Sequence, residues 1–437
     1  MNFDGVTSLG VLNLSGGSLG GNGAVTQFLR FTVVGSTTVK FVVVNPINDE
    51  ILHKDYQRHD TKQPEKCIEM LRTIEEKFPE VLSISGPYAD YGKQIRRGID
   101  LYMAEHGDTV AGRKVKLIVK DDTGIAPQIA KRESQQLLIN DKVDILAGYD
   151  LTPNAFSAAP LATEAKVPMV VMNAATASVV EKSPYIVRTS MTMPQSAWAM
   201  AQWAWANKVK TAYIVVADYG PGHDSQAQFT KTFTSLGGKI VGEVRTPVTS
   251  TDYSPFLQRL KDAKPDAAYF FVPPGSSMVA LSKGFRELGL DKLGIKEMGP
   301  GDMTDESSLA ALGDAALGFI TAFHYSDAHD SPENRAFTAA YAKAYKDDRP
   351  NFMTVGAYDG MHLIYETLKK TQGDASGDAF IAAAKGLQWV SPRGPVSIDP
   401  KTRDIVQNEY IRKLERVGGV LKNVEFDTFK AVDPQAP

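Results

Sequence analysis

The chain has 437 residues, a formal net charge of −3 and no block of basic residues, so neither nucleic acid nor an anionic membrane surface is an expected partner. This length exceeds the usual limit of a single hydrophobic core and predicts two lobes or more. Cys67 is the only cysteine, which excludes an intramolecular disulfide and a cysteine-rich metal site, and no apolar run reaches the roughly 18 residues that span a bilayer.

Residues 1–80 differ from the rest of the chain and are predicted to form an atypical N-terminal extension. A secretory signal needs an early basic region and an unbroken apolar core. Here the first basic residue is Arg30 and glycines interrupt residues 16–23, so we predict no export signal. Residues 28–44 predict one or two strands. Pro79 cannot donate a ladder hydrogen bond, which predicts that the strand at this point is short or irregular.

The stretch after residue 80 has the pattern of a strand, a tight turn and a helix. A short apolar run at residues 81–84 ends in Ser85-Gly86-Pro87-Tyr88, and an amphipathic helix pattern begins near Tyr91. Small residues at the carboxyl end of a parallel strand leave backbone N–H groups and a helix N-terminus free to meet a ligand. The two tyrosines stand beside this opening, so we predict the edge of a binding cleft.

Residues 115–288 alternate apolar runs with helical patterns in two successive series. The first series predicts strands at 115–119, 143–147 and 168–172 and helices at 126–140 and 154–165. The second predicts helices at 194–206, 225–236, 253–263 and 276–288 and strands at 212–217, 239–244 and 267–272. Continuous apolar runs between helices of this length are typical of parallel strands in a doubly wound sheet. Two such series, divided near residues 189–194, predict two Rossmann-like α/β lobes.

After residue 299 the regular alternation of apolar runs and helical patterns ends. Long helical patterns cover 333–346 and 354–369, and β-type segments follow at 395–398 and 409–414. The end of the chain is largely polar and contains Pro434 and Pro437, so we predict that it frays.

Five segments occur in the order found in one family of binding proteins. They are SGPYADYG at 85–92, AGRKVKLIVKDD at 111–122, APLATEAKVPMVVMNAATAS at 159–178, DYGPG at 218–222 and RGPVSIDPKTRDIVQNEYIRKLERVGG at 393–419. The chain from Val81 onward therefore resembles the type I periplasmic solute-binding proteins. The resemblance is closest to the leucine/isoleucine/valine-binding branch that serves ABC importers.

This resemblance implies a type I periplasmic-binding fold, in which two lobes are joined by three crossovers and hold the ligand in the cleft between them. It places the crossovers near residues 189–195, 321–325 and 400–406. The resemblance thus implies that residues 81–190 and 326–400 form lobe 1 and that residues 191–325 and 401–430 form lobe 2. Residues 431–437 are predicted to be a frayed tail.

The function implied is that of a non-enzymatic substrate-binding component of an ABC importer. It would capture a branched-chain amino acid or a related small carboxylate by hinge closure of its two lobes. The implied partners are the ligand and the permease subunits, with no nucleic acid and no cofactor, and the protein is expected to be a monomer. The resemblance also implies a periplasmic location, whereas no export signal is visible in residues 1–80.

Two turns are implied to hold the ligand's carboxylate. Ala174 and Thr176 lie in the turn after the strand at 168–172, where the family uses backbone N–H groups and a threonine hydroxyl, and neutral donors of this kind stabilise an anion. The segment Tyr149–Thr152 ends the preceding strand in the same way, and Thr152 is the candidate contact there. The alternative for both threonines is an ordinary helix cap.

Aromatic and proline residues are predicted to shape the rest of the site. Tyr91 and Tyr219 match positions at which the family has aromatic ligand contacts, and a tyrosine at a cleft edge supplies apolar area and one hydroxyl. Tyr149 and Phe271 would also suit a flat ring, although they are equally plausible as packing residues. Pro274 lies in a Pro-Pro-Gly turn that would expose backbone groups to the site.

The sequence departs from the amino-acid binders at one informative position. In that branch a glutamate directly after a Gly-Pro pair binds the ligand's ammonium, whereas this chain has Gly301 there and Asp302 one position later. An unpaired buried ammonium would be destabilising. Asp302 is therefore a candidate ligand contact, and the alternative is a ligand that lacks an α-amino group, such as an aromatic or aliphatic acid.

Three other functional classes share parts of this pattern. A nicotinamide-dependent enzyme needs a G-x-G-x-x-G loop after a strand, which the chain lacks, and a repressor with this fold needs a basic helix-turn-helix in front of it. The ligand-sensing ectodomain of a receptor would use the same binding body and remains an alternative. His324 and His329 lack a third ligand at metal-site spacing, so we predict solvated histidines and no metal.

Overall fold

The computed structural model describes residues 7–14, 27–33, 39–44, 51–53, 76–346 and 348–436. These residues belong to two compact units, Met1–Ile74 and Glu75–Pro437. The first unit contains an antiparallel sheet whose strands are hydrogen-bonded in chain order: β1 (Thr7–Leu14), β2 (Gln27–Val33), β3 (Val39–Val44) and β4 (Ile51–His53). Residues 28–44 therefore contribute to two strands, which is one of the two outcomes that the sequence allowed.

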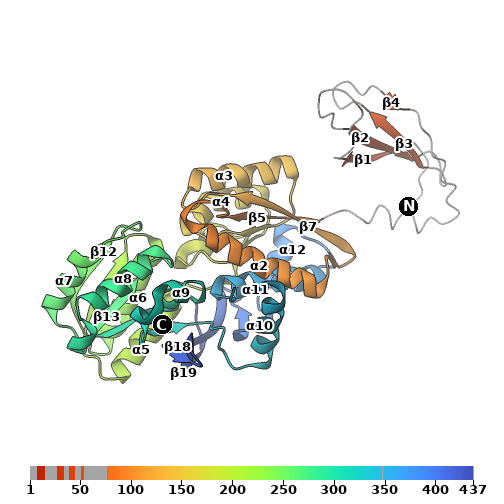
Figure 1. Cartoon of the computed structure of the whole chain (residues 1–437). Helices are drawn as coiled ribbons and strands as arrows, with labels where there is room; N and C mark the ends of the chain where they lie inside the picture. Colours follow the sequence, from red (N-terminus) through yellow and green to blue (C-terminus); the bar gives the residue numbers. More distant parts are fainter. Residues whose placement is uncertain are drawn as a thin grey trace. The chain divides into compact units, whose positions relative to one another are not determined.

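The second unit is built from two α/β lobes (Figure 1). The sheet of the first lobe has the order β10-β9-β8-β5-β7-β6. Its strands are β5 (Glu76–Leu82), β6 (Thr109–Val110), β7 (Arg113–Asp121), β8 (Leu146–Gly148), β9 (Met169–Val171) and β10 (Ile186–Arg188). All except β6 pair in parallel, and β8, β9 and β10 are buried along their whole length, as expected for strands covered on both faces.

Helices cover both faces of the first sheet. On one face α3 (Pro127–Gln136) packs against α4 (Thr152–Ala165), and on the other α2 (Ala89–His106) packs against α11 (Phe352–Lys370) (Figure 1). Two shorter helices accompany α2 and α11: α10 (Pro332–Ala344) contacts α2, and α12 (Gly377–Ala384) contacts α11 and β10. Gly98 allows the close approach of α2 to α11, because a Cβ at this position would collide with the carbonyl oxygen of Thr354.

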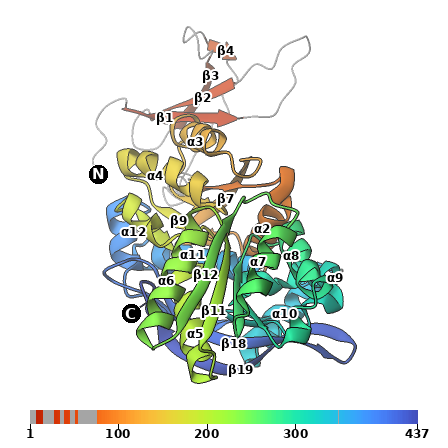
Figure 2. The ribbon, with the colours of Figure 1, turned by 90° about the vertical axis from the view of Figure 1, so that its left-hand side faces the viewer.

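The sheet of the second lobe has the order β12-β11-β13-β14-β15-β18-β17-β16, with β19 on β18. Its strands are β11 (Thr211–Ala217), β12 (Lys239–Thr246), β13 (Ala267–Phe271), β14 (Lys296–Pro300), β15 (Ile320–Phe323), β16 (Gln388–Ser391), β17 (Gly394–Ile398), β18 (Ile405–Val417) and β19 (Val420–Val432). Figure 2 shows α5 (Met193–Ala206) and α6 (Gly220–Ser235) on one side of β11 and β12, and α7 (Ser254–Ala263) and α8 (Ser276–Glu287) on the other. The predicted fold class of two doubly wound lobes is confirmed.

β5 is a full central strand despite Pro79. It pairs with β7 from Glu76 to Leu82, whereas β8 pairs only with Glu80 and Val81. The carbonyl of Val81 accepts a hydrogen bond from the β8 side and that of Leu82 from the β7 side. Because the two sides alternate along a strand, the nitrogen of Pro79 faces the β8 side at a point before β8 begins. The missing N–H removes no ladder hydrogen bond, and the prediction of a short or irregular strand is wrong.

The boundary predicted at residue 400 is displaced. The helices of residues 326–400 belong to the first lobe, but β16 and β17 join β18 in an antiparallel arrangement and extend the second sheet. The loop between β17 and β18 then returns to the first lobe, where Arg188 Nε and Asp404 Oδ1 form a buried ion pair of 2.6 Å. A short β-type segment does not reveal from its sequence which of two sheets it completes, because this depends on tertiary pairing.

The C-terminal segment packs against the second lobe through residue 436, so the predicted frayed tail is wrong over these residues. β18 and β19 form a long antiparallel hairpin. Beyond it, the carbonyl of Pro434 accepts a 2.5 Å hydrogen bond from the Thr192 hydroxyl, and the carbonyl of Val432 accepts one of 3.0 Å from Gln195 Nε2. The polar composition was misleading because many β19 side chains face solvent while most of its backbone pairs with β18.

Candidate functional site

A cleft forms where strands of the two lobes end. The turns after β8 and β9 of the first lobe meet those after β11, β13 and β14 of the second, which is the edge at which open α/β sheets bind ligands. The cleft is lined by Tyr91, Asp150, Leu151, Thr152, Asn173, Ala175, Met191, Met193, Tyr219, Pro221, Phe271, Pro274, Asp302 and Phe352. The site therefore consists of short turns held by buried strands, which fixes its geometry.

The first-lobe end of the cleft offers hydrogen-bond donors. Thr152 is the first residue of α4, and its hydroxyl oxygen accepts from the Thr176 hydroxyl at 3.0 Å and from the Thr176 N–H at 3.4 Å. Neither threonine makes a side-chain capping bond, so the helix-cap alternative does not account for them. Because the Thr152 oxygen already accepts both bonds, its own O–H remains able to donate into the cleft.

Two helix N-termini converge on these threonines from opposite lobes. α4 begins at Thr152, and α6 begins at Gly220, which lies so close that a Cβ on Gly220 would stand 2.5 Å from the Thr176 hydroxyl oxygen. The first N–H groups of a helix lack intrahelical partners and carry a positive partial charge. This end of the cleft therefore suits an anion such as a carboxylate.

The middle of the cleft is aromatic. Tyr219 and Phe271 stack with their ring planes 11° apart and their centroids 6.0 Å apart, and Phe352 adds a third ring from the first lobe. Tyr91 enters from α2, and burial raises the pKa of its hydroxyl well above the usual range, with Tyr219 and Asp302 adding to the effect. Flat side chains from both lobes thus enclose a slot suited to a ring.

The second-lobe end carries a buried carboxylate. Asp302 follows β14, and its Oδ2 atom is buried without a hydrogen-bond partner among the described residues. Burial raises the pKa of Asp302 to about 7, although its own backbone N–H and the Arg412 guanidinium act in the opposite direction. A group in this state is poised to interact with a polar ligand atom.

Two further polar residues line the first-lobe side. Asp150 Oδ2 accepts from the Ser83 N–H at 3.1 Å, while its Oδ1 has no partner in the described part of the chain. Burial, and then the nearby Asp122, raise the pKa of Asp150 to about 7. Asn173 donates to the Asp150 carbonyl at 2.7 Å, and its side-chain oxygen is buried and unpaired.

The lobes are in contact at both lips of the cleft. At one lip, the Ala177 N–H of the first lobe donates to Asp224 Oδ2 of α6 at 2.7 Å. At the other, Asn351 Nδ2 of the first lobe donates to Asp305 Oδ1 of the second at 2.9 Å. The cavity between them is about 30 Å³, room for roughly one water molecule. A ring-sized ligand therefore requires the lobes to move apart from the arrangement seen here.

The family pattern described as Periplasmic binding protein matches residues 77–419. The chain belongs to this family. A relative named Leu/Ile/Val-binding protein homolog 6, from Brucella melitensis, is 44% identical over 353 residues that cover 80% of this chain and 90% of the relative. These similarities confirm the resemblance that the five sequence segments indicated.

Two solved structures have a higher sequence identity to this periplasmic binding protein than the Brucella relative has. A solute-binding protein of an ABC transporter from Rhodopseudomonas palustris BisB5, in complex with 3,4-dihydroxybenzoic acid, is 52% identical with a TM-score of 0.79, over 82% of this chain and 98% of that one. Another, from Rhodopseudomonas palustris HaA2 with p-hydroxybenzoic acid, is 46% identical with a TM-score of 0.80, over 82% and 97% of the two chains.

Five of the residues proposed from the sequence line the cleft of this binding protein: Tyr91, Thr152, Tyr219, Pro274 and Asp302. Thr176 lies directly behind Thr152, to which it is hydrogen-bonded. Ala174 is buried, and its carbonyl accepts from Arg188 at 2.8 Å, while the next residue, Ala175, lines the cleft instead.

Tyr149 points away from the cleft. Its side chain is fully buried in the core between the first sheet and α3, with its hydroxyl 2.8 Å from that of Ser134. It has a positive φ of 58°, so the chain turns sharply here, and a ligand contact is excluded by this position. Asp150 and Asn173 were missed, although both directly follow buried strands, which is the same signal that identified Thr152.

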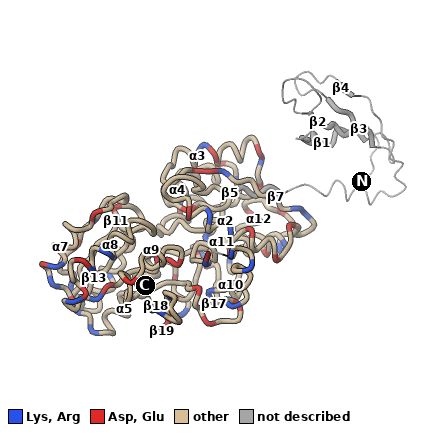
Figure 3. Tube along the Cα trace, viewed as in Figure 1, with Lys and Arg blue, Asp and Glu red and all other residues tan. Residues whose placement is uncertain are grey.

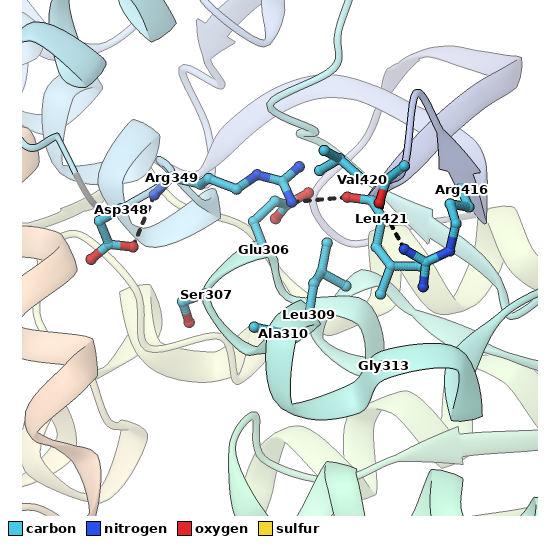
Figure 4. A pocket seen from close by; sticks show the side chains of 11 residues that line it. Glu306, Ser307, Leu309, Ala310, Gly313, Asp348, Arg349, Arg416, Val420 and Leu421 are labelled. Carbon is cyan, nitrogen blue, oxygen red and sulfur yellow. Dashed lines mark hydrogen bonds between the residues drawn. The ribbon is translucent and has the colours of Figure 1, made fainter.

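A larger hollow of about 440 Å³ lies elsewhere on the second unit (Figure 4). It is lined mainly by residues of 306–313, of the β18–β19 hairpin, and by Asp348 and Arg349. Arg349 already forms an ion pair with Asp327 at 2.6 Å and donates to the Leu421 carbonyl at 2.9 Å, and Arg416 donates to the Gly419 carbonyl at 2.7 Å. Its cations are thus engaged, and the interlobe cleft remains the better site.

Neither the distribution of charged residues nor a set of metal ligands indicates another site in the described residues. Figure 3 shows acidic and basic residues interspersed along the chain of both lobes. No group of three His, Cys, Asp or Glu side chains is placed to hold a metal there, and none of the described helices is long and apolar enough to cross a membrane. His324 is fully buried rather than solvated, and burial, with Arg393 and Arg412 nearby, lowers its pKa well below the usual range.

Proposed function

We propose that this protein is the solute-binding component of an ABC importer and that it captures an aromatic carboxylate by closing its lobes over it. The observation that supports this most is the pairing of an anion-binding end, at Thr152 and the N-termini of α4 and α6, with an aromatic slot. The carboxylate would lie at the first-lobe end and the ring between Tyr219, Phe271 and Phe352.

The ligands of the two Rhodopseudomonas relatives fit this arrangement. Each is a benzoic acid with one or two ring hydroxyls, bound to a chain that is 52% or 46% identical to this one. A benzoic acid has a carboxylate at one end of a flat apolar ring, which is the order of chemistry found along the cleft. The ligand is proposed to leave the protein unchanged, because the family's role is capture and delivery to permease subunits.

A branched-chain amino acid is the second candidate. Asp302 and Asp150 each present a buried, unpaired oxygen to the cleft, and either carboxylate could pair with an ammonium. Against this, the glutamate of the amino-acid binders has no room at position 301, because a Cβ on Gly301 would collide with Phe323 and Arg412. Asp302 is one residue later on a short turn, so its aim differs from that of the missing glutamate.

Membership of the periplasmic binding protein family implies a periplasmic location. The contacts that close the cleft lie within one chain, which is consistent with the expected monomer. Size-exclusion chromatography with light scattering would test this, and a stable dimer would contradict it.

The proposed ligand class can be tested by calorimetric titration of the full chain. The panel would contain benzoate, 4-hydroxybenzoate, phenylacetate, L-leucine and L-phenylalanine. We expect benzoates to bind at a one-to-one ratio and to be recovered unchanged by mass spectrometry. Binding of L-leucine without any aromatic acid would replace the aromatic proposal by the amino-acid one, and a chemically altered ligand would contradict the proposed role.

A further inference from the structure

We infer that this cleft selects aromatic acids that carry a ring hydroxyl opposite the carboxylate, with Asp302 as the residue that accepts the hydroxyl hydrogen. The inference rests on the proposed function, and it assigns the specificity of that same site to one side chain. It begins from the unpaired Oδ2 atom of Asp302, which lies in the cleft wall of the second lobe.

The protein itself does not supply the missing donor. Arg412 is the nearest cation that acts on Asp302, but its N–H groups are used elsewhere. Nε donates to the Thr321 hydroxyl at 3.2 Å, Nη2 to the Gly301 carbonyl at 3.2 Å and the Thr304 hydroxyl at 3.4 Å, and Nη1 to the Tyr325 carbonyl. Nη1 also lies 3.7 Å from Glu306 Oε1. The guanidinium is thus fully engaged by groups other than Asp302.

The tyrosine hydroxyls near Asp302 do not supply the donor either. The Tyr269 hydroxyl is 2.8 Å from that of Ser225. Burial raises the pKa values of Tyr91 and Tyr219, and the charge of Asp302 adds to the effect. Neither hydroxyl donates to Asp302 Oδ2 in the described structure. A buried carboxylate oxygen left in this state is destabilising, so a ligand that donates to it gains affinity.

The position of Asp302 indicates where on the ligand that donor should lie. Thr152 comes from the first lobe and Asp302 from the second, and both line the same small cavity with aromatic side chains from both lobes beside them. A ring whose carboxylate is held at Thr152 would direct its opposite edge to the second-lobe wall. A hydroxyl at this edge satisfies Asp302, whereas a hydrogen or fluorine atom leaves the carboxylate unpaired.

A ring hydroxyl is a better match than an ammonium for a group enclosed in this way. A hydroxyl is neutral, so it can donate to Asp302 without bringing a second charge into a cavity walled by Phe271, Phe352 and two methionines. It can donate either to an ionised carboxylate, in a stronger charge-assisted bond, or to the carbonyl oxygen of a protonated one. Asp302 would therefore favour aromatic acids that carry a hydrogen-bond donor at the end of the ring opposite the carboxylate.

The test compares four ligands by calorimetric titration on the full chain: benzoate, 4-fluorobenzoate, 3-hydroxybenzoate and 4-hydroxybenzoate. The fluoro compound is the matched control, because it resembles the hydroxyl in size and cannot donate. We expect 4-hydroxybenzoate to bind about 10- to 100-fold more tightly than benzoate, 4-fluorobenzoate and 3-hydroxybenzoate, because only its hydroxyl lies opposite the carboxylate. Equal affinities for the four ligands would overturn the inference while leaving the proposed capture of aromatic acids intact.

The assignment to Asp302 is tested with D302L, which removes the acceptor and keeps the branching at Cγ, and D302N, which retains an amide oxygen. We expect D302L to bind 4-hydroxybenzoate and 4-fluorobenzoate equally and D302N to keep part of the preference. Benzoate binding by each variant shows that the cleft is intact. A full hydroxyl preference in D302L would overturn the assignment. If the wild-type chain bound none of the four ligands, both the proposed function and this inference would be wrong.

Discussion

The two ends of the cleft differ in chemistry and in origin. The first-lobe end is built from threonine hydroxyls and the N-terminus of α4, which donate hydrogen bonds, whereas the second-lobe wall presents Asp302, which accepts them. Aromatic side chains from both lobes lie between these ends. A ligand that has an anion at one end and a donor at the other can satisfy both lobes only when they are closed.

This division explains how binding and closure can be coupled. The contacts at the two lips, Ala177 with Asp224 and Asn351 with Asp305, form only when the lobes approach each other. A ligand shifts the balance toward the closed form by the difference between its affinities for the two forms. Since each lobe contributes a different half of the ligand-binding chemistry, the open form holds the ligand by only one of its ends.

The largest effect is expected from removing the donors of the first-lobe end. In the double variant T152V/T176V, valine keeps the shape of each side chain but removes both hydroxyls. Hydrogen bonds to a charged group contribute about 1.5–3 kcal/mol each, so we expect the affinity for every benzoate to fall about 100-fold. Calorimetric titration would measure this.

The variant T338V serves as a control, because the half-buried Thr338 lies on α10, is not among the residues that line the cleft, and its hydroxyl donates only to backbone carbonyls. An unchanged benzoate affinity in T152V/T176V, with normal thermal unfolding, would show that the carboxylate is held elsewhere.

A smaller loss is expected from the aromatic slot. F271L removes the ring that stacks on Tyr219 and keeps an apolar side chain of similar size. An aromatic pair contributes about 0.5–1.5 kcal/mol beyond buried area, so we expect an affinity loss of about 3- to 10-fold for all aromatic acids alike. The matched control is F426L, since Phe426 is 51% exposed on β19. Equal affinities for F271L and F426L would place the ring outside this slot.

The affinity should also depend on pH through Asp150. Its pKa is raised to about 7 by burial and by Asp122, above the ordinary value of 3.8. A ligand carboxylate nearby favours the protonated form still more, so binding takes up a proton and the affinity falls as pH rises from 6 to 8. We expect a decrease of about 3- to 10-fold over this range.

The variant D150N removes this titrating group and should give a shallower profile between the same pH values, because Asp302, whose pKa burial also raises to about 7, remains in the cleft. A profile for D150N as steep as that of the wild type would assign the dependence to another group.

The smallest effect is expected at the lips. D224N weakens the acceptor for the Ala177 N–H without removing it, because the amide oxygen is neutral. We expect an affinity loss of about threefold, mainly through faster dissociation of the ligand. D262N is the matched control, because Asp262 lies on the exposed side of α7 and accepts only from Gln258 among the described side chains. Stopped-flow dissociation rates that match in D224N and D262N would show that this contact does not stabilise the closed form.

Much of this arrangement could be predicted from the sequence because the cleft is made of turns after buried strands. Thr152 and Tyr219 each lie within four residues of the end of an apolar strand, and parallel strands bring their carboxyl ends to one edge. The absence of a glutamate at position 301 agrees with the structure, because a Cβ there would collide with Phe323 and Arg412. Local pattern was sufficient wherever the strand and its turn adjoin in the chain.

The features that could not be predicted depend on where a side chain points and on which distant residue or strand it pairs with. Tyr149 follows β8 as closely as Asp150 does, yet a positive φ turns its side chain into the core, and this angle is not visible in the residue types. The unpaired state of Asp302 depends on where Arg412, a residue 110 positions later, directs its N–H groups. The sheet to which β16 and β17 belong is likewise decided by tertiary pairing.

The central claim is that both lobes close on a ring compound because it carries a carboxylate. Small-angle X-ray scattering of the full chain, titrated with 4-hydroxybenzoate or with 4-hydroxybenzyl alcohol, tests this most directly, since the two ligands differ only at the acid group. We predict that the acid reduces the radius of gyration, or holds it at the compact value with a large rise in melting temperature, while the alcohol changes neither. The same response to both ligands, or no response to the acid, would contradict the account.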